Sequence, residues 1–169
     1  ETAYCGAEPI RADTLERFAE AFEPCGFRRD ALYPCFGLAE STLMVSGGLG
    51  ASVPVVLSVD KQALKQNKVV LSFDKTERRQ PLVGCGGALL NQRVLIVDPD
   101  TCARLPEERV GEIWVSGPSV AQGYWNAEEL TRRTFGACEE ETSEGPFLRT
   151  GDLGFLHAGQ LFATGRLKD

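Results

Sequence analysis

The chain has 169 residues, of which 43% are hydrophobic and 25% are charged, and its formal net charge is −6. This composition is typical of one soluble globular domain that can bury a core. Its three Arg-Arg pairs are scattered and form no positive stripe, so we do not expect a nucleic-acid-binding protein. No apolar run reaches the roughly 18 to 20 residues that span a bilayer, and no secretion signal precedes the first elements. We therefore expect no membrane span and a cytoplasmic location.

The six cysteines are too widely spaced in the sequence to form a CxxC pair, and the single histidine, His157, is distant from all of them. A local zinc site is therefore not expected. We predict free, mostly buried thiols, which agrees with a reducing compartment.

The first part of the chain alternates between strand and helix patterns. A short strand ends near Cys5, and apolar residues at helical spacing predict a helix after Asp13, with Asp13 and Glu16 as a capping box. Pro24 and a following glycine end this helix. The stretch 33–48 then joins a glycine-bearing turn to an apolar strand. This alternation predicts an α/β layer.

Later segments read mostly as strands separated by turns. We predict strands at 53–59, 69–73, 92–97, 110–116 and 147–149, and a hairpin of 155–157 with 160–163. One helix is predicted between them, at 127–135 and capped by Asn126, and 61–68 is a short polar or helical piece. We predict turns at 84–87, which is rich in glycine, and at 150–152. The segments 74–80, a solvated charge run, 118–123, a loop, and 138–145, an exposed loop, complete the prediction.

Two places have chemistry suited to a nucleotide. In 36–41, the Phe36 ring can stack on a base, Gly37 allows close backbone approach and the Glu40 carboxylate can bind magnesium. A buried turn with an incidental glutamate fits the same spacing. Asp152, at a strand end, can accept hydrogen bonds from two vicinal ribose hydroxyls, although a turn aspartate also fits.

Five motifs occur in an order that resembles the adenylate-forming enzymes. They are Gly6-Ala7-Glu8-Pro9, Phe36-Gly37-Leu38-Ala39-Glu40, Gly111 to Pro118 with Gly123-Tyr124-Trp125, Arg149-Thr150-Gly151-Asp152-Leu153-Gly154, and Gly165-Arg166-Leu167-Lys168-Asp169. The form GLAES followed by Thr42-Leu43 is most similar to the fatty acyl-AMP ligases. These enzymes activate a fatty acid with ATP and pass the acyl group to a carrier-protein thiol instead of coenzyme A.

The resemblance implies a set of ATP-binding residues. Gly6, Ala7 and Glu8 would border the adenine, Phe36 would stack on it beside Gly37, Leu38 and Ala39, Glu40 would bind Mg²⁺, Asp152 would hold the ribose hydroxyls, Arg166 would reach the ribose or phosphates, and Lys168 would be the hinge. Apolar groups around Leu38, Leu43 and Met44 would form one wall of an acyl tunnel. The sequence departs from the family at three positions. Phe36 stands where the family usually has tyrosine, and Cys5 stands where these ligases commonly have asparagine. Ala39 stands where many relatives have threonine, although alanine is usual in the ligase branch.

The resemblance also implies an organisation. Residues 1–48 would end an α/β subdomain, and residues 49–169 would form a mostly antiparallel, distorted β-barrel subdomain ending at the hinge to an absent C-terminal domain. Segment 53–79 resembles the insertion of these ligases, whose proposed role is to brace that domain and disfavour coenzyme A. The triphosphate-binding loop would precede Glu1 and the adenylation lysine would follow Asp169. We therefore expect an internal fragment with no catalytic residue of its own, inactive in isolation.

Two alternatives remain open from the sequence. One is an acyl-CoA or aryl-CoA synthetase, or an amino-acid-activating domain. The other is a non-catalytic nucleotide-binding or scaffold module of a multidomain synthase. The presence of Glu40, Asp152 and Arg166 together argues against loss of catalysis.

Overall fold

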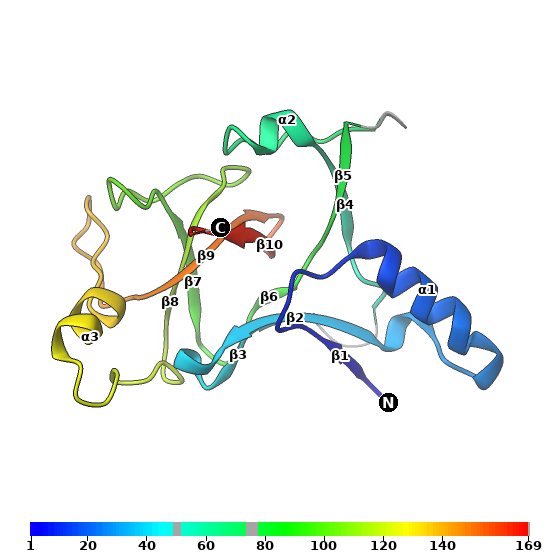
Figure 1. Cartoon of the computed structure of the whole chain (residues 1–169), viewed down its shortest axis with the longest axis horizontal. Coiled ribbons are helices and arrows are strands. Elements are labelled where there is room, and N and C mark those ends of the chain that lie inside the picture. The colour runs from blue at the N-terminus through cyan, green and yellow to red at the C-terminus, as the bar shows by residue number, and fades with distance from the viewer. Residues whose placement is uncertain (49–51, 74–77, 169) are drawn as a thin grey trace.

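A computed structural model describes residues 1–48, 52–73 and 78–168 (Figure 1). Its α-helices are α1 (Ala12–Phe22), α2 (Lys61–Leu64) and α3 (Glu128–Phe135). Its strands are β1 (Ala3–Cys5), β2 (Leu32–Leu38), β3 (Leu43–Gly47), β4 (Val56–Asp60), β5 (Arg79–Val83), β6 (Gly87–Ala88), β7 (Arg93–Val97), β8 (Gly111–Ser116), β9 (Leu148–His157) and β10 (Gln160–Arg166). Short 3₁₀ turns occupy Glu23–Cys25, Arg29–Ala31 and Ala39–Ser41.

The first sheet has the order β1-β2-β3-β6 and is mixed, because β1 runs parallel to β2 while β2–β3 and β3–β6 are antiparallel. Helix α1 covers part of it through Leu15 and Ala19, which pack with Leu32 and Val83. Of the residues predicted to form its apolar face, Leu15 and Ala19 are buried but Phe18 and Phe22 are exposed, so the predicted face is buried only in part. The combination of helix and mixed sheet confirms the predicted α/β class.

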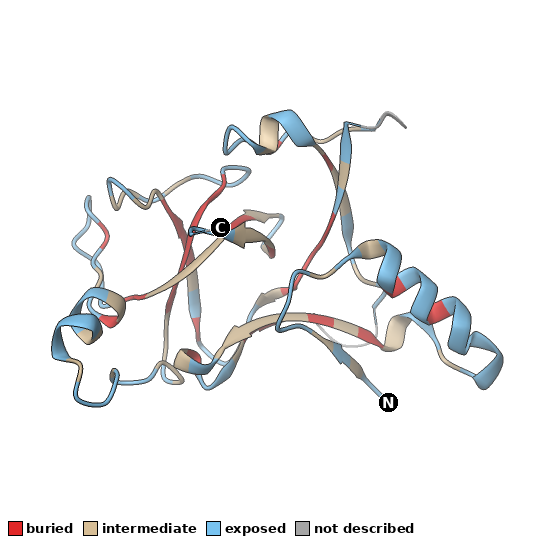
Figure 2. Cartoon of the chain, in the orientation of Figure 1, coloured by how far each residue is buried: buried red, intermediate tan, exposed pale blue. Residues whose placement is uncertain are grey.

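The second sheet has the order β10-β9-β8-β7 and is antiparallel throughout. Strand β8 is its most buried member, and Figure 2 shows this burial along most of the strand. Ile113 and Val115 on β8 pack with Val45 of the first sheet in one hydrophobic cluster. The two larger sheets therefore share one hydrophobic core.

A separate two-stranded sheet pairs β4 with β5, and α2 lies between them in the chain; β4 and α2 fall within the predicted insertion 53–79, whereas β5 begins at its last residue. Val59 and Leu82 of this hairpin pack with Phe155 and Phe162 of β9 and β10. The carboxylate of Asp60 accepts the backbone N–H groups of residues 62 and 63 at 2.8 Å each, and so caps α2. The hairpin is thus packed on the second sheet.

Across the described ranges, the strand pairing forms three separate sheets, and a closed barrel is not shown. The predicted barrel was therefore too specific, because alternating patterns identify antiparallel strands but not whether their ends meet. Within the same ranges, none of the helices has the length and apolar character that a bilayer span requires.

Both predicted helix caps were wrong. Helix α1 begins at Ala12 with Arg11 at the N-cap position, so Asp13 lies inside the first turn, where it forms an ion pair with Arg11 at 2.9 Å. The N-cap of α3 is Ala127, and Asn126 precedes it with φ of 53°. In both cases tertiary structure shifts the helix start by one or two residues from the residue with the best capping side chain.

Several other local predictions need correction. The predicted strand 69–73 is reduced to a bridge between Leu71 and Val59, flanked by hydrogen bonds from the Asp60 N–H to the Val70 carbonyl and from the Ser72 N–H to the Ser58 carbonyl, each at 2.8 Å. Positions 150–152 are not a turn but part of β9. Of the charge run 74–80, residues 74–77 lie outside the described residues, and Arg79 and Gln80 begin β5, which was not predicted as a strand; β6, at the end of the predicted glycine turn, was not predicted either. The other predicted strands, the hairpin turn at 158–159 and the loop at 118–123 agree with the structure to within a few residues.

The predicted exposed loop 138–145 contains a buried carboxylate. Glu139 is 4% exposed and accepts the backbone N–H groups of Glu141 and Thr142 and the Thr142 hydroxyl. These hydrogen bonds lower the pKa of Glu139 to about 2, the Thr142 hydroxyl having the largest effect. The Glu139 carboxylate therefore holds the loop together through hydrogen bonds to the next residues of the same loop.

All six cysteines are free thiols, as predicted, but they are not mostly buried. Cys85 is buried, Cys25 and Cys138 are exposed, and the other three are intermediate. Among the described residues there is no cluster of three His, Cys, Asp or Glu side chains that could hold a metal ion.

Candidate functional site

A cavity of about 670 Å³ is lined by both larger sheets and by the loop between β1 and α1. Its lining includes Ala7, Glu8, Phe36, Gly37, Leu38, Ala39, Glu40, Asp152 and Arg166. These nine predicted site residues come from segments more than a hundred positions apart in the sequence. The structure therefore brings the predicted residues together at one site, while their individual roles stay predictions.

Three residues with a predicted role at the site, Gly6, Met44 and Lys168, lie outside this lining, whereas Leu38 and Leu43 are part of it. Gly6 is exposed directly after β1, where a Cβ would approach the carbonyl oxygen of Cys35 to 2.9 Å, so the close approach of the chain to β2 favours glycine here. Cys5, the residue at the end of β1 that departs from the family pattern, is also outside the lining, and its carbonyl oxygen accepts the Cys35 thiol hydrogen at 3.5 Å. Lys168 is exposed just beyond β10.

The segment at Phe36 is strand rather than the predicted turn, and it has an irregularity at its centre. The register between β2 and β3 shifts between Phe36 and Gly37. A Cβ on Gly37 would come within 2.6 Å of the Leu43 carbonyl carbon and 3.0 Å of the Met44 Cα. Only glycine lets the two backbones approach this closely while the chain turns into the 3₁₀ segment that holds Glu40.

The Glu40 carboxylate lies at one end of the cavity and has a partner that the sequence did not identify. The hydroxyl of Tyr124 donates to Glu40 Oε1 at 2.7 Å, and the backbone N–H of Ala121 donates to the Glu40 carbonyl at 2.8 Å. Burial, followed by the Glu40 carboxylate, raises the pKa of Tyr124 to about 12, so the phenol remains a donor at neutral pH. The loop before α3 thus fixes the orientation of Glu40.

Asp152 and Arg166 lie opposite each other on β9 and β10, and Arg166 Nε donates to Asp152 Oδ1 at 3.3 Å. The Asp152 side chain is 18% exposed, whereas that of Arg166 is 71% exposed. A carboxylate acceptor and a guanidinium donor therefore line the same part of the cavity, an arrangement suited to a group that offers both hydroxyls and negative charge.

The cavity wall also includes the thiols of Cys35 and Cys85. Burial raises the pKa of Cys85 to about 12, and Cys35 has a raised pKa for the same leading reason. Both are therefore neutral thiols at pH 7 and behave as small apolar groups in the wall.

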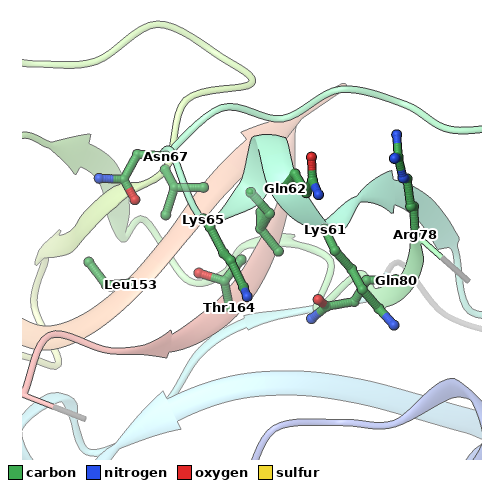
Figure 3. A pocket seen from close by; sticks show the side chains of 10 residues that line it. Lys61, Gln62, Lys65, Asn67, Arg78, Gln80, Leu153 and Thr164 are labelled. Carbon is green, nitrogen blue, oxygen red and sulfur yellow. The ribbon is translucent and has the colours of Figure 1, made fainter.

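A second cavity of about 580 Å³ has a different character (Figure 3). Figure 3 shows Lys61 on α2, Lys65 at the C-cap of α2 and Gln80 on β5 around it, and Arg78 lies beside them. Its polar wall is formed by residues other than the predicted nucleotide-binding set. The aromatic ring, the glycine backbone and the two carboxylates all belong to the first cavity.

A family model described as "AMP-binding enzyme" matches residues 1–125, which include the Phe36–Glu40 segment and Tyr124. The chain belongs to the AMP-binding enzyme family. Asp152 and Arg166 lie beyond the matched residues, yet they line the same cavity.

The similarity to individual AMP-binding enzymes extends over almost the whole chain. A medium-chain-fatty-acid–[acyl-carrier-protein] ligase of Moorena producens is 49% identical over 99% of this chain and 29% of its own length. The crystal structure of a fatty acyl-adenylate ligase of L. pneumophila, in complex with acyl adenylate and pyrophosphate, is 45% identical with a TM-score of 0.91, over 99% of this chain and 29% of that one. An adenylation domain of a keto acid-selecting NRPS module, bound to keto acyl adenylate, is 26% identical with a TM-score of 0.86, over 99% of this chain and 31% of that one. The chain thus spans about 29% of the length of the first relatives it matches.

Proposed function

We propose that this chain is part of an ATP-dependent fatty acyl-AMP ligase, which activates a fatty acid as its acyl-adenylate and transfers the acyl group to the phosphopantetheine thiol of a carrier protein. The observation behind this proposal is the cavity that gathers Phe36, Glu40, Asp152 and Arg166 from both larger sheets. The similarity to a fatty-acid–[acyl-carrier-protein] ligase and to a fatty acyl-adenylate ligase over almost all of the chain supports the choice of substrate and acceptor.

In this proposal the cavity holds the adenosine part of ATP. The Phe36 ring stacks on the adenine, beside the backbone of Ala7 and Glu8. Asp152 accepts hydrogen bonds from the ribose hydroxyls, and Arg166 donates to the ribose or phosphate oxygens. The ion pair between Asp152 and Arg166 keeps both groups at the cavity before the nucleotide arrives.

Magnesium fits this site through Glu40. A carboxylate is a suitable ligand for Mg²⁺, and the Tyr124 hydroxyl holds Glu40 Oε1 in a defined orientation. Because the described residues form no cluster of three metal-binding side chains, the other ligands would be phosphate oxygens and water, which Mg²⁺ commonly retains. When bound, the ion would neutralise the negative charge of the phosphates.

The isolated chain is proposed to be inactive. Attack of a carboxylate on the α-phosphate requires positioned positive charge around the phosphates, and Arg166 is the one cation in this cavity's described lining. The proposed division at residue 48, the bracing role of segment 53–79 and the hinge at Lys168 belong to the same proposal. The packing of Val59 and Val69, both within segment 53–79, in one cluster with Phe155 of β9 and Phe162 of β10 supports a rigid insertion. Six free thiols favour the cytoplasm as its location.

The experiment uses the longer protein that contains this chain. Fatty acid and ATP are supplied, pyrophosphate release is measured, and coenzyme A then competes with a phosphopantetheinylated carrier protein for the acyl group. The proposal predicts fatty-acid-dependent pyrophosphate release and transfer to the carrier alone. Ready formation of acyl-CoA would assign the protein to the synthetases, and activation of an amino or keto acid instead would assign it to the adenylation domains, which the similarity to the NRPS structure makes the second candidate. AMP binding with no turnover on any acid would favour the non-catalytic module.

A further inference from the structure

The backbone around Asp152 is irregular in a specific way. Strand β8 pairs Glu112 with Leu153 and Trp114 with Arg149, so the three residues 150–152 of β9 lie opposite the single residue Ile113 of β8. Gly151, in the middle of these three residues, has φ of +72°. This is a β-bulge, which locally redirects a strand and the side chains beside it. The direction of the Asp152 carboxylate therefore depends on what fixes the bulge.

A buried carboxylate fixes one side of the bulge. Glu112 is 2% exposed, and its Oε1 accepts the backbone N–H of Gly151 at 3.1 Å. Its Oε2 accepts Trp114 Nε1 and Arg149 Nε, both at 2.9 Å. A charged residue in the most buried strand is costly unless it is paired and hydrogen-bonded, and both oxygens of Glu112 are used.

Arg149 compensates the charge of Glu112. Its Nη2 lies 2.7 Å from Glu112 Oε2, and its guanidinium carbon lies 5.4 Å from the centre of the Trp114 ring. The pair is thus held between the indole and the bulge. Because the charge is balanced by Arg149, Oε1 is available to accept the N–H of Gly151, which the bulge removes from the regular strand ladder.

Thr150 fixes the other side of the bulge. Its hydroxyl donates to the Ile113 carbonyl at 2.7 Å and accepts the backbone N–H of Asp152 at 3.1 Å. The N–H groups of two consecutive residues, Gly151 and Asp152, are therefore both held by side-chain acceptors. Beyond the bulge, Asp152 is paired with Arg166 on β10.

We propose that Glu112, assisted by Thr150, is a positioning residue for nucleotide binding: it fixes the Gly151 bulge and so orients the Asp152 carboxylate toward the ribose hydroxyls. This inference rests on the proposed function, because it requires Asp152 to accept those hydroxyls. Neither Glu112 nor Thr150 lines the cavity, so both act through the backbone of β9.

The test compares two nucleotides that differ only at the hydroxyls. Isothermal titration of the longer protein measures the Kd of AMP and of 2′,3′-dideoxy-AMP for the wild type, Glu112→Gln and Thr150→Val. Because hydrogen bonds to a charged acceptor have effects of about tenfold or more, the wild type should prefer AMP by at least about tenfold. Glutamine has a single acceptor oxygen and cannot satisfy both Gly151 and the Trp114–Arg149 side, so Glu112→Gln should bring this preference close to 1. Asp152→Asn provides the reference for a lost ribose acceptor.

Val115→Ala is the matched control. Val115 is fully buried in the same strand, but it packs in the hydrophobic core, so its truncation should lower the melting temperature and leave the preference for AMP unchanged. If Glu112→Gln does not fold, Thr150→Val decides, since valine has the shape of threonine without the hydroxyl. Its preference for AMP should fall severalfold.

Folded variants of Glu112 and Thr150 that keep the wild-type preference would overturn the inference. A variant that weakens both nucleotides equally would also overturn it, because that result shows a general structural effect. A wild type that binds AMP without preferring it over the dideoxy nucleotide would instead refute the role of Asp152, and with it this inference. A wild type that binds neither nucleotide would refute the proposed function itself.

Discussion

Gly37→Ala is the substitution whose effect can be worked out most directly from the structure. A Cβ at this position would lie 2.6 Å from the Leu43 carbonyl carbon and 3.0 Å from the Met44 Cα, both backbone atoms of β3. Ordinary carbon–carbon contacts lie at about 3.5–4.0 Å, and the Leu43 carbonyl oxygen would be closer still to this Cβ, so β2 and β3 would have to separate by more than about 1 Å. The shift occurs between Phe36, the proposed adenine contact, and Glu40, the proposed magnesium ligand.

Two measurable effects follow from this separation. Overpacking of this kind destabilises by about 1–3 kcal/mol, so the melting temperature of the longer protein should fall. Because Phe36 moves with β2, the Kd of AMP should rise by at least about tenfold, the equivalent of about 1.4 kcal/mol. Calorimetric titration with AMP and a thermal melt measure the two effects on the same sample.

Gly48→Ala is the control for this substitution. Gly48 follows β3, and a Cβ there would only make ordinary contact with the Tyr33 ring at 3.8 Å. This variant should melt and bind AMP as the wild type does. If Gly37→Ala also kept the wild-type melting temperature and AMP affinity, the close approach of β2 and β3 would not be what shapes the cavity.

Three further predictions concern side chains outside the immediate contacts. Tyr124→Phe keeps the aromatic ring but removes the donor to Glu40, so the Mg²⁺ concentration that half-saturates Mg·ATP binding should rise by about two- to tenfold; unchanged metal dependence would argue against Glu40 as the ligand. The pKa of Glu139 is about 2 in the folded chain against an ordinary value of 4.5, so its stabilisation is fully present above pH 4.5 and is lost as the pH falls toward 2. Acid unfolding of Glu139→Gln should therefore show a shallower loss of stability in that window, and curves that stay parallel to the wild type would contradict this. Cys85, with its pKa near 12, should react with iodoacetamide at pH 8 far more slowly than exposed Cys25, and equal labelling by mass spectrometry would show that the wall of the cavity opens.

Strand segments were predictable where side chains alternate or turn residues are strong. The segment of β8 was identified because its residues alternate, and the β9–β10 hairpin because Ala158-Gly159 lies between two strand patterns. The caps of α1 and α3 were not, because a good capping side chain such as Asp13 indicates a helix start only to within a residue or two. Closure of the sheets depends on contacts between distant strands, which a local pattern does not contain.

At the candidate site, too, features with a local sequence signal were predicted and contacts between distant residues were not. Residues with their own chemical signal, such as Phe36, Glu40 and Asp152, were identified from the sequence, and the cavity brings them together. Tyr124 was present in a quoted motif, but nothing local indicated that its hydroxyl reaches Glu40, 84 positions away. Glu112 did have a local signal, since a lone acidic residue within an apolar strand must find a buried partner.

The turn predicted at positions 150–152 was wrong for an instructive reason. Threonine, glycine and aspartate favour turns, but here they form a bulge inside β9, with Gly151 in the left-handed region. Glycine indicates an unusual backbone in either case. The neighbouring strand, through Glu112, decides that the chain continues as a strand.

The most direct test of the proposed site is photolabelling of the longer protein with 8-azido-ATP, followed by identification of the labelled peptides. The two cavities make this decisive, because one contains Phe36 and Asp152 and the other contains Lys61, Lys65 and Arg78. We predict that the label is found in the peptides around Ala7 and Phe36 and that excess AMP prevents it. Labelling confined to the basic cavity between α2 and β10, with AMP competing for it, would contradict the assignment of the nucleotide site.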